Sequence, residues 1–155
     1  MAKKYLIVAK EAELLLPEAV AVAKRPGVEI IVTGVGGTNV VKALRGLSRR
    51  SIVYNVGYCG SSFFEVGSVV PIDLCRLYHP NCEFDEETFQ IWGMGRDNIC
   101  LTAGDFVTSP KDLPPRAVVD MELAYIVAFG FHIIHAIKYV SDRFNYQEYQ
   151  SCLKK

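Results

Sequence analysis

Three carboxylates and one phenyl ring follow apolar, strand-like segments of this sequence. Glu13 comes after the first such segment, Phe106 after a later one, and Glu122 and Asp142 after two more. In open α/β sheets, ligands bind at the edge formed by the carboxyl ends of the strands. A phenyl ring at that edge can stack on a flat base. The four residues therefore predict a ligand site at this edge.

Two glycine-rich stretches also follow predicted strands. Gly34-Val35-Gly36-Gly37 is similar to a dinucleotide-binding turn, but Asn39 stands at the third glycine position and Asn55 replaces the acid that would bind ribose. We therefore expect a tight turn whose backbone N–H groups face the ligand edge and can hold an anion, a hydroxyl or water. The second stretch, 57–62, is expected to be another turn.

Apolar runs alternate with helix-compatible segments along the chain, and Pro17 interrupts the first of these helices. Strands alternating with helices predict an α/β fold with three layers (α/β/α) and a mostly parallel, mixed sheet. The whole chain, 1–155, is expected to form one domain. Residues 77–97 and 104–113 are expected to be loops. The strands are predicted at 4–9, 28–33, 51–56, 69–74, 98–103, 117–120 and 132–140, and the helices at 10–24, 38–47, 121–130 and 145–153.

Composition argues against several classes of partner. The 17 basic and 17 acidic residues cancel, which does not favour nucleic acid or an anionic membrane as a partner. The longest apolar stretch, 123–137, is too short to span a membrane. Five scattered cysteines predict reduced thiols and a cytoplasmic location. Cys75, His79 and Cys82 lack a clear fourth ligand, so we expect no metal site, and no cofactor is expected.

The motifs around these residues carry a family likeness. In order, they resemble those of the nucleoside phosphorylase and nucleosidase superfamily, and within it the methylthioadenosine/S-adenosylhomocysteine nucleosidases. The pair VVDME and KYVSD is the most specific part of the resemblance. The matching segments are IVAKEAEL (7–14), TGVGGTNV (33–40), NVGYCGSS (55–62), EVGSVVPID (65–73), TAGDFVTS (102–109), VVDMELAYI (118–126) and IKYVSD (137–142).

The resemblance implies a catalytic set of acids. Glu13 matches the acid that activates water, and Asp142 matches the acid that protonates the purine at N7. Glu122 matches the carboxylate that binds the ribose hydroxyls. A carboxyl group has a reference pKa of ~3.9, so Asp142 needs a raised pKa to act as a general acid. Burial and a hydrogen bond from Ser141 would shift that pKa in opposite directions.

The resemblance also implies the substrate-binding surface. Met121 stands beside the ribose-binding acid, Phe106 matches the ring that stacks on the base, and Val107 matches its neighbour, whose backbone contacts the base. The turn that lines base and sugar is matched by Tyr58, Cys59 and Gly60. Asn145, Tyr146 and Tyr149 are further candidates between which the sequence does not choose.

The implied activity is cleavage of the N-glycosidic bond of a purine nucleoside by water, with a 5′-modified adenosine such as methylthioadenosine as one candidate substrate. Asn55 stands where related phosphorylases tend to have arginine, which favours hydrolysis, although Lys10 and Lys138 are possible substitutes. A phosphate-dependent phosphorylase and a non-catalytic nucleoside-binding protein remain the alternatives. The resemblance further implies a homodimer in which the partner closes the pocket.

Overall fold

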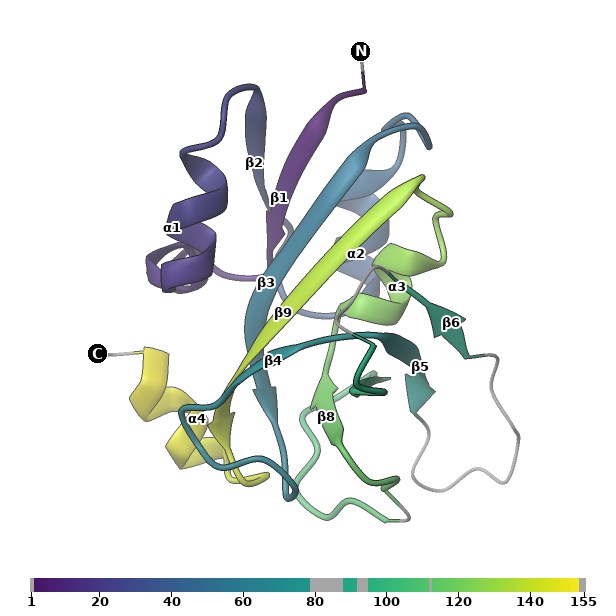
Figure 1. Cartoon of the computed structure of the whole chain (residues 1–155). Helices are drawn as coiled ribbons and strands as arrows, with labels where there is room; N and C mark the ends of the chain where they lie inside the picture. The colour runs from purple at the N-terminus through teal and green to yellow at the C-terminus, as the bar shows by residue number, and fades with distance from the viewer. Residues whose placement is uncertain (1, 79–87, 92–94, 112, 154–155) are drawn as a thin grey trace.

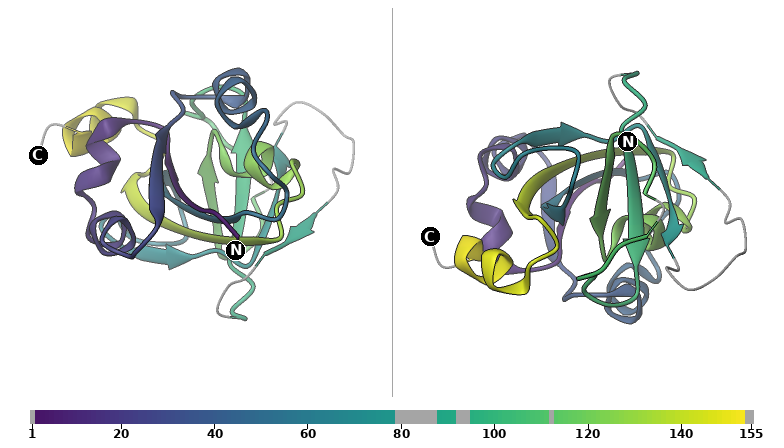
Figure 2. Two further views of the ribbon diagram at one scale, coloured as in Figure 1. Left: turned by 90° about the horizontal axis from the view of Figure 1, so that it is seen from above. Right: turned by 90° about the horizontal axis from the view of Figure 1, so that it is seen from below.

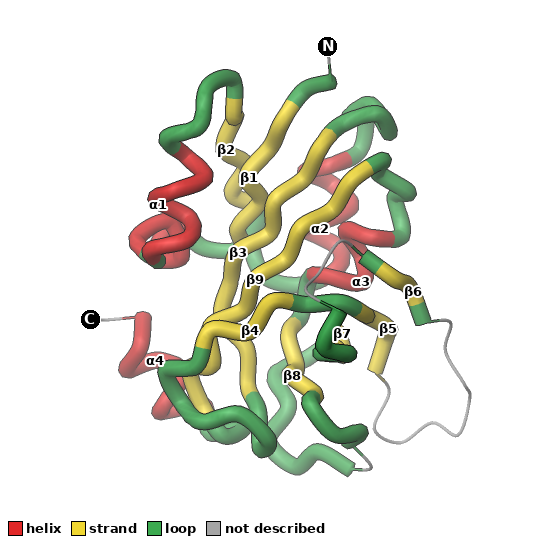
Figure 3. Tube along the Cα trace, in the orientation of Figure 1, coloured by secondary structure: helices red, strands yellow, loops and turns green. Residues whose placement is uncertain are grey.

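The computed structural model describes residues 2–78, 88–91, 95–111 and 113–153. Within them, nine strands form one mixed sheet, flanked by four α-helices and one 3-10 helix, η1 (Figure 3). The strands are β1 (Lys4–Val8), β2 (Val28–Val32), β3 (Ile52–Gly60), β4 (Val69–Pro71), β5 (Leu74–Tyr78), β6 (Phe89–Gln90), β7 (Ile99–Ala103), β8 (Ala117–Asp120) and β9 (Ile133–Asp142). The helices are η1 (Glu11–Leu15), α1 (Pro17–Ala23), α2 (Gly37–Leu44), α3 (Leu123–Val127) and α4 (Tyr146–Leu153).

The sheet consists of two parallel groups that meet with opposite directions. In the first, β2, β1, β3 and β9 are parallel neighbours in that order (Figure 1). In the second, β8, β7 and β5 are parallel neighbours. The two groups join where Gly60, at the end of β3, pairs antiparallel with Val119 of β8. Carboxyl ends of strands from both groups therefore overlap at one place.

Helices cover both faces of the sheet, as Figure 2 shows from two directions. Helix α1 packs Ala19 and Val22 on one face, together with Leu16, which precedes the helix. Helices α2 and α3 pack on the opposite face and contribute residues such as Leu44 and Ile126 to the largest hydrophobic cluster. The predicted three-layer α/β/α fold is confirmed.

The first strand illustrates why its sequence lacks a polar face. Tyr5 and Ile7 belong to the cluster under α2 and α3, whereas Leu6 and Val8 belong to the cluster under α1. Successive side chains of a strand point to opposite faces, so a strand covered on both faces is apolar throughout. Full burial of a side chain such as Leu6 stabilises the fold by about 1.5–3 kcal/mol.

The prediction of a turn at 57–62 is wrong in its first part, because β3 continues to Gly60. The pairing of β3 with β9 runs without interruption from Ile52 to Cys59, and the register shifts only between Cys59 and Gly60. Glycine is disfavoured in strand interiors unless another group approaches the backbone closely. The functional site supplies such groups at Gly57 and Gly60.

The predicted strand at 69–74 is two strands that pair with different partners. β4 pairs antiparallel with β9, and β5 pairs parallel with β7. Between them, the buried Asp73 carboxylate accepts the backbone N–H groups of Gly95, Arg96 and Asn98. These three bonds fix the point where the chain passes from one strand group to the other.

Two predicted helices are shorter in the structure. The helix at 10–24 is divided into η1 and α1 because Leu16 is extended, with φ −65° and ψ 140°, as favoured before Pro17. The helix at 121–130 is reduced to α3, and β9 extends through Ser141 and Asp142 rather than ending at 140. The sequence order suggests that the strands at 117–120 and 132–140 are neighbours, and this prediction is wrong because β3 lies between β8 and β9.

The remaining elements agree with prediction within a few residues, and none of the described helices is long and apolar enough to cross a membrane. Within the expected loop at 77–97, the described residues include the end of β5 and the short strand β6, and β6 pairs antiparallel with the start of β5 at Leu74 and Cys75. The rest of that segment, at 79–87 and 92–94, lies outside the described residues, as do His79 and Cys82 of the excluded metal site.

Candidate functional site

A cavity of about 310 Å³ lies where the two strand groups meet. All ten site residues predicted from the sequence line it: Glu13, Tyr58, Cys59, Gly60, Phe106, Val107, Met121, Glu122, Ser141 and Asp142. The structure therefore brings together residues from β1–η1, β3, the loop after β7, the β8–α3 connection and β9. The other lining residues are Ala9, Lys10, Val35, Asp105, Val119, Asp120, Phe144, Tyr146 and Tyr149.

Glu13 is held by three backbone donors. Its side chain folds back over the start of η1, where Oε1 accepts the N–H groups of Ala9 (2.8 Å) and Lys10 (3.0 Å). Its other oxygen, Oε2, accepts the N–H of Tyr58 at 2.7 Å. Burial raises the pKa of Glu13, while the nearby Lys138 charge and the three hydrogen bonds oppose that rise. The bonds fix the carboxyl group at the junction of β1 and β3.

Gly57 explains how Glu13 can lie so close to β3. A Cβ atom at position 57 would lie 2.7 Å from Glu13 Oε2 and 3.3 Å from Lys138 Nζ. Any side chain there would push the carboxylate out of place. The glycine inside the strand thus provides the space for one acid of the cavity.

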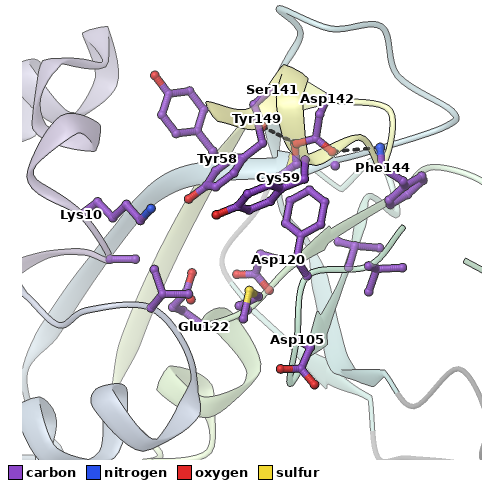
Figure 4. Close-up of a pocket in the computed structure, with 18 of the residues that line it drawn as sticks. Lys10, Tyr58, Cys59, Asp105, Asp120, Glu122, Ser141, Asp142, Phe144 and Tyr149 are labelled. Atoms are coloured by element: carbon purple, nitrogen blue, oxygen red, sulfur yellow. Dashed lines mark hydrogen bonds between the residues drawn. The ribbon is translucent and has the colours of Figure 1, made fainter. Parts of the chain in front are cut away.

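Asp142, the last residue of β9, is almost completely buried. Its Oδ2 accepts a hydrogen bond from the Ser141 hydroxyl at 2.6 Å, and its Oδ1 accepts the Phe144 N–H at 2.9 Å (Figure 4). Burial raises the pKa of Asp142, and the bonds from Ser141, Phe144 and Asn145 lower it, with a net rise. The opposing effects of burial and Ser141 expected from the sequence are therefore both present.

Gly60 leaves space for the Asp142 carboxylate, as Gly57 does for that of Glu13. A Cβ at position 60 would lie 2.9 Å from Asp142 Oδ1 and 3.1 Å from the Phe144 ring. Phe144 itself adopts a left-handed backbone conformation, with φ 67°, which is uncommon for a residue with a side chain. That conformation accompanies the hydrogen bond from its N–H to Asp142.

Glu122 connects β8 to α3 and lies at the N-cap of that helix. Its Oε2 accepts the N–H of Gly36 at 2.9 Å, so the glycine turn after β2 binds a carboxylate of the same chain. Burial, and next the charge of Asp120, raise the pKa of Glu122 to about 8, against the opposing effect of Lys138. At neutral pH, Glu122 of the ligand-free chain is therefore mostly protonated.

A buried ion pair lies beside these acids. Lys138 Nζ is 2.8 Å from Asp120 Oδ2, and both side chains are at most 1% exposed. Asp120 also accepts hydrogen bonds from the Thr102 hydroxyl (2.6 Å) and the Leu123 N–H (2.8 Å). Although burial opposes it, the Lys138 charge and these bonds hold the pKa of Asp120 below its usual value. The pair therefore stays ionised.

Aromatic rings form one wall of the cavity. The Phe106 ring lies 5.1 Å from the ring of Tyr146 and 5.5 Å from that of Tyr149, both from α4. Tyr149 also meets Tyr58 edge to face at 6.5 Å. Lys10 Nζ lies 5.2 Å from the centre of the Tyr149 ring. Such a wall can stack on a flat ligand.

Several cavity residues were not identified from the sequence. The sequence does not choose among Asn145, Tyr146 and Tyr149. In the structure, the packing of α4 places Tyr146 and Tyr149 in the cavity wall. The side chain of Asn145 accepts the N–H groups of Gln147 and Glu148. Asp120 was visible as an acid ending a strand, but its ion pair requires the fold. Within the described part of the chain, no group of three His, Cys, Asp or Glu side chains is placed to hold a metal ion.

Comparison with known proteins gives similarity in structure alone. No protein-family model and no curated protein sequence matches the chain. Among solved structures, the MTA nucleosidase of Chlamydia trachomatis (D161N variant) superposes with a TM-score of 0.75 at 20% identity, covering 99% of this chain and 88% of that one. The Chlamydia protein has also been solved bound to MTA and to adenine.

Two further similar structures come from other bacteria. The MTA/SAH nucleosidase of Colwellia psychrerythraea, solved with adenine, has a TM-score of 0.72 at 17% identity and covers 99% of this chain and 88% of its own. Futalosine hydrolase of Helicobacter pylori has a TM-score of 0.70 at 10% identity, with 99% and 91% covered. The fold is that of the nucleosidases. The resemblance inferred from sequence motifs is thus confirmed for the fold.

Proposed function

We propose that this protein is a purine nucleoside hydrolase that cleaves the N-glycosidic bond and releases the free base and the ribose moiety. The observation that carries the proposal is the convergence of Glu13, Glu122 and Asp142 on one cavity beside Phe106. Similar structures with this fold hold MTA or adenine. A 5′-modified adenosine such as methylthioadenosine is therefore the first candidate substrate.

In this proposal, Asp142 is the general acid. Cleavage of the bond leaves negative charge on the purine, so a proton delivered to the base makes it a better leaving group. The net rise in the pKa of Asp142 caused by its burial favours the protonated form that this role requires. Ser141 and the Phe144 N–H hold the carboxyl group in a fixed orientation.

Glu13 is the proposed base that orients and deprotonates the attacking water. Three backbone N–H groups bind its oxygens, and hydrogen bonds of this kind favour the ionised carboxylate. Burial is the largest effect and raises the pKa of Glu13 overall, whereas the nearby Lys138 charge acts with the hydrogen bonds to favour the carboxylate. A fixed carboxylate near the sugar can accept the proton as water adds to C1′.

Glu122 is the proposed partner of the ribose hydroxyls, with Met121 beside it. An ionised Glu122 would stabilise the positive charge that grows on the sugar in the transition state. The base would stack on Phe106, next to Val107. The walls that enclose base and sugar would be formed by Tyr58, Cys59 and Gly60.

Phosphorolysis is the alternative reaction, and one observation keeps it open. Lys138 is engaged with Asp120 and buried, and the side-chain amide of Asn55 donates to the Ile7 carbonyl. Neither observation favours a phosphate pocket made from these residues. Lys10, however, lines the cavity and is available to an anion.

Base release from adenosine, inosine and methylthioadenosine, with and without phosphate, tests the proposal. We expect release without phosphate, and a fall of about 10²–10⁴-fold in Asp142→Asn. Asp105→Asn is the matched control, because Asp105 lines the same cavity but is exposed. Release only with phosphate would establish the phosphorylase instead, and nucleoside binding without release would exclude both enzymes.

The proposal includes a homodimer in the cytoplasm. Three large apolar side chains between the end of β3 and the start of β4 are exposed, namely Phe63 (53%), Val66 (44%) and Val69 (49%), which supports self-association. The described cysteines, Cys59, Cys75, Cys100 and Cys152, are free thiols, which supports a reducing compartment. Light scattering coupled to size-exclusion chromatography measures the oligomeric state.

A further inference from the structure

Lys10 is the only lysine or arginine among the described residues that line the cavity. It follows β1 directly and is half-buried. Its backbone N–H binds Glu13, whereas its side chain extends to the Tyr149 ring, 5.2 Å away. Figure 4 shows the ammonium group directed into the cavity, on the side opposite Asp105.

The ammonium group has no ionic partner within the described part of the chain. No described carboxylate lies within 4 Å of it, although five acids line the same cavity. It contacts the face of Tyr149, and a cation–π contact at a partly exposed site is weaker than a charge-assisted hydrogen bond to an oxyanion. An anionic ligand could therefore recruit Lys10.

The acids around the cavity do not cancel this attraction. Asp120 is neutralised by Lys138, and three backbone N–H groups offset part of the negative charge of Glu13. Glu122 and Asp142 both have raised pKa values because of burial, which reduces their negative charge before a ligand binds. Asp105, which is exposed, stands across the cavity from Lys10.

The position of Lys10 indicates which part of a nucleoside would reach it. Tyr149 touches both Phe106, at 5.5 Å, and the Lys10 ammonium, at 5.2 Å. The ammonium thus lies one aromatic ring away from the surface on which the base would stack. The Lys10 N–H also binds Glu13 Oε1 at 3.0 Å, and Glu13 is the proposed base that acts at C1′. Lys10 therefore adjoins the proposed sugar position rather than that of the purine.

We propose that Lys10 binds an anionic oxygen group next to the sugar, either a carboxylate or phosphate carried by the nucleoside or free inorganic phosphate. This inference rests on the proposed cleavage of the N-glycosidic bond, and in its free-phosphate form phosphate takes the place of water as the nucleophile. A substrate-borne anion makes Lys10 a specificity residue for charged nucleosides. If the anion is free phosphate, Lys10 binds the second substrate of a phosphorolysis. In that reaction a phosphate oxygen bonds to C1′ and the C1′–N bond breaks. The base keeps the bonding electrons and takes the Asp142 proton.

Steady-state kinetics with three nucleosides distinguish these sources. The substrates are uncharged adenosine, adenosine 5′-monophosphate and adenosine 5′-carboxylic acid, in phosphate-free buffer. For a substrate-borne anion, kcat/KM should be about tenfold or more higher for a charged nucleoside than for adenosine. That preference should be lost in Lys10→Met, kept in Lys10→Arg, and unchanged in the control Lys42→Met, whose side chain is exposed on α2.

A second arm adds inorganic phosphate to adenosine and measures ribose 1-phosphate. Phosphate-dependent product that is lost in Lys10→Met assigns the anion to free phosphate. The proposal is overturned if Lys10→Met leaves the charged-to-uncharged ratio unchanged and phosphate has no Lys10-dependent effect.

Failure of the proposed function can be separated from failure of this inference. If the wild-type protein cleaves none of the nucleosides, calorimetry of adenosine, adenosine 5′-monophosphate and phosphate binding to wild type and Lys10→Met still decides the matter. Tighter binding of an anion that depends on Lys10 supports the site. Equal binding of these ligands to both proteins, or no binding to either, overturns it.

Discussion

Lys138 Nζ lies 2.8 Å from Asp120 Oδ2, and neither side chain is more than 1% exposed. The pair joins β8 to β9 across β3, the strand that pairs with both. A Cβ atom at position 57 would be 3.3 Å from Lys138 Nζ and 2.7 Å from Glu13 Oε2, so the lysine also lies near the proposed base. One buried cation thus influences Asp120, Glu13 and Glu122.

Breaking this pair should destabilise the fold strongly. Lys138→Met leaves Asp120 as an uncompensated buried charge, and we expect a loss of about 3–5 kcal/mol in the free energy of unfolding. Urea denaturation at constant pH measures it. The double variant Lys138→Met/Asp120→Leu should recover part of the loss, since no buried charge remains, although the Thr102 hydroxyl and Leu123 N–H lose an acceptor. Single-variant losses below about 1 kcal/mol would contradict the ionised pair.

Ser141 should tune the proton affinity of Asp142. Its single hydroxyl hydrogen lies between two acceptors, Asp142 Oδ2 at 2.6 Å and the Cys59 carbonyl at 3.3 Å. When it donates to Asp142 it favours the carboxylate, so Ser141→Ala should raise the pKa of Asp142 further. The alkaline limb of kcat/KM, where the acid loses its proton, should therefore move to higher pH.

The control for this change is Ser151→Ala, because Ser151 is exposed on α4 and donates to the Gln147 carbonyl. Its pH profile should match that of the wild type. A shift of the Ser141→Ala limb to lower pH, or an equal shift in both variants, would contradict the assignment of the limb to Asp142.

Nucleoside binding should release a proton from Glu122. Burial raises its pKa to about 8, so at pH 7 roughly 0.9 of the molecules carry the proton. If ribose hydroxyls bind the ionised carboxylate, binding at pH 7 expels up to that fraction of a proton, and affinity rises with pH until about 8. Titration calorimetry in buffers of different ionisation enthalpy counts the proton. Glu122→Gln should abolish the release while Asp142→Asn retains it, and equal release from wild type and Glu122→Gln would count against the idea.

The sequence predicts which residues line the cavity better than it predicts the strands that build it. Glu13, Phe106, Glu122 and Asp142 follow apolar runs and so carry a local signal, whereas the family resemblance implies the other six. All ten line the cavity. The direction in which strands meet carries no such signal. The reversal between the two strand groups depends on the pairing of Gly60 with Val119, which lie far apart in the sequence.

The clearest error of the sequence prediction is the turn expected at Gly57 and Gly60, and it too arises from contacts between residues far apart in the sequence. Gly57 and Gly60 suggest a turn, because glycine is common in turns and weakens strands. Their actual role is to leave room for Glu13 and Asp142, which approach β3 from other elements. The ion pair of Lys138 with Asp120 was equally invisible, because each residue lies in an apolar run and its partner comes from another strand.

Gly57→Ala should displace the Glu13 carboxylate while the protein stays folded. The added Cβ would lie 2.7 Å from Glu13 Oε2, so the carboxylate must move away from the Tyr58 N–H that holds it. Because the backbone of position 57 does not need a positive φ, the strand itself should persist. We expect base release to fall by about tenfold or more, up to the 10²–10⁴-fold that complete loss of a general base gives. Circular dichroism should remain that of the wild type.

Gly104→Ala is the matched control for this variant. Its Cβ would meet no atom within 4 Å, and its φ is not positive, although it lies in the loop that carries Phe106. Its activity should stay close to that of the wild type. If Gly57→Ala retained full activity while Glu13→Gln lost it, the space that Gly57 leaves beside Glu13 would not be needed to position the base.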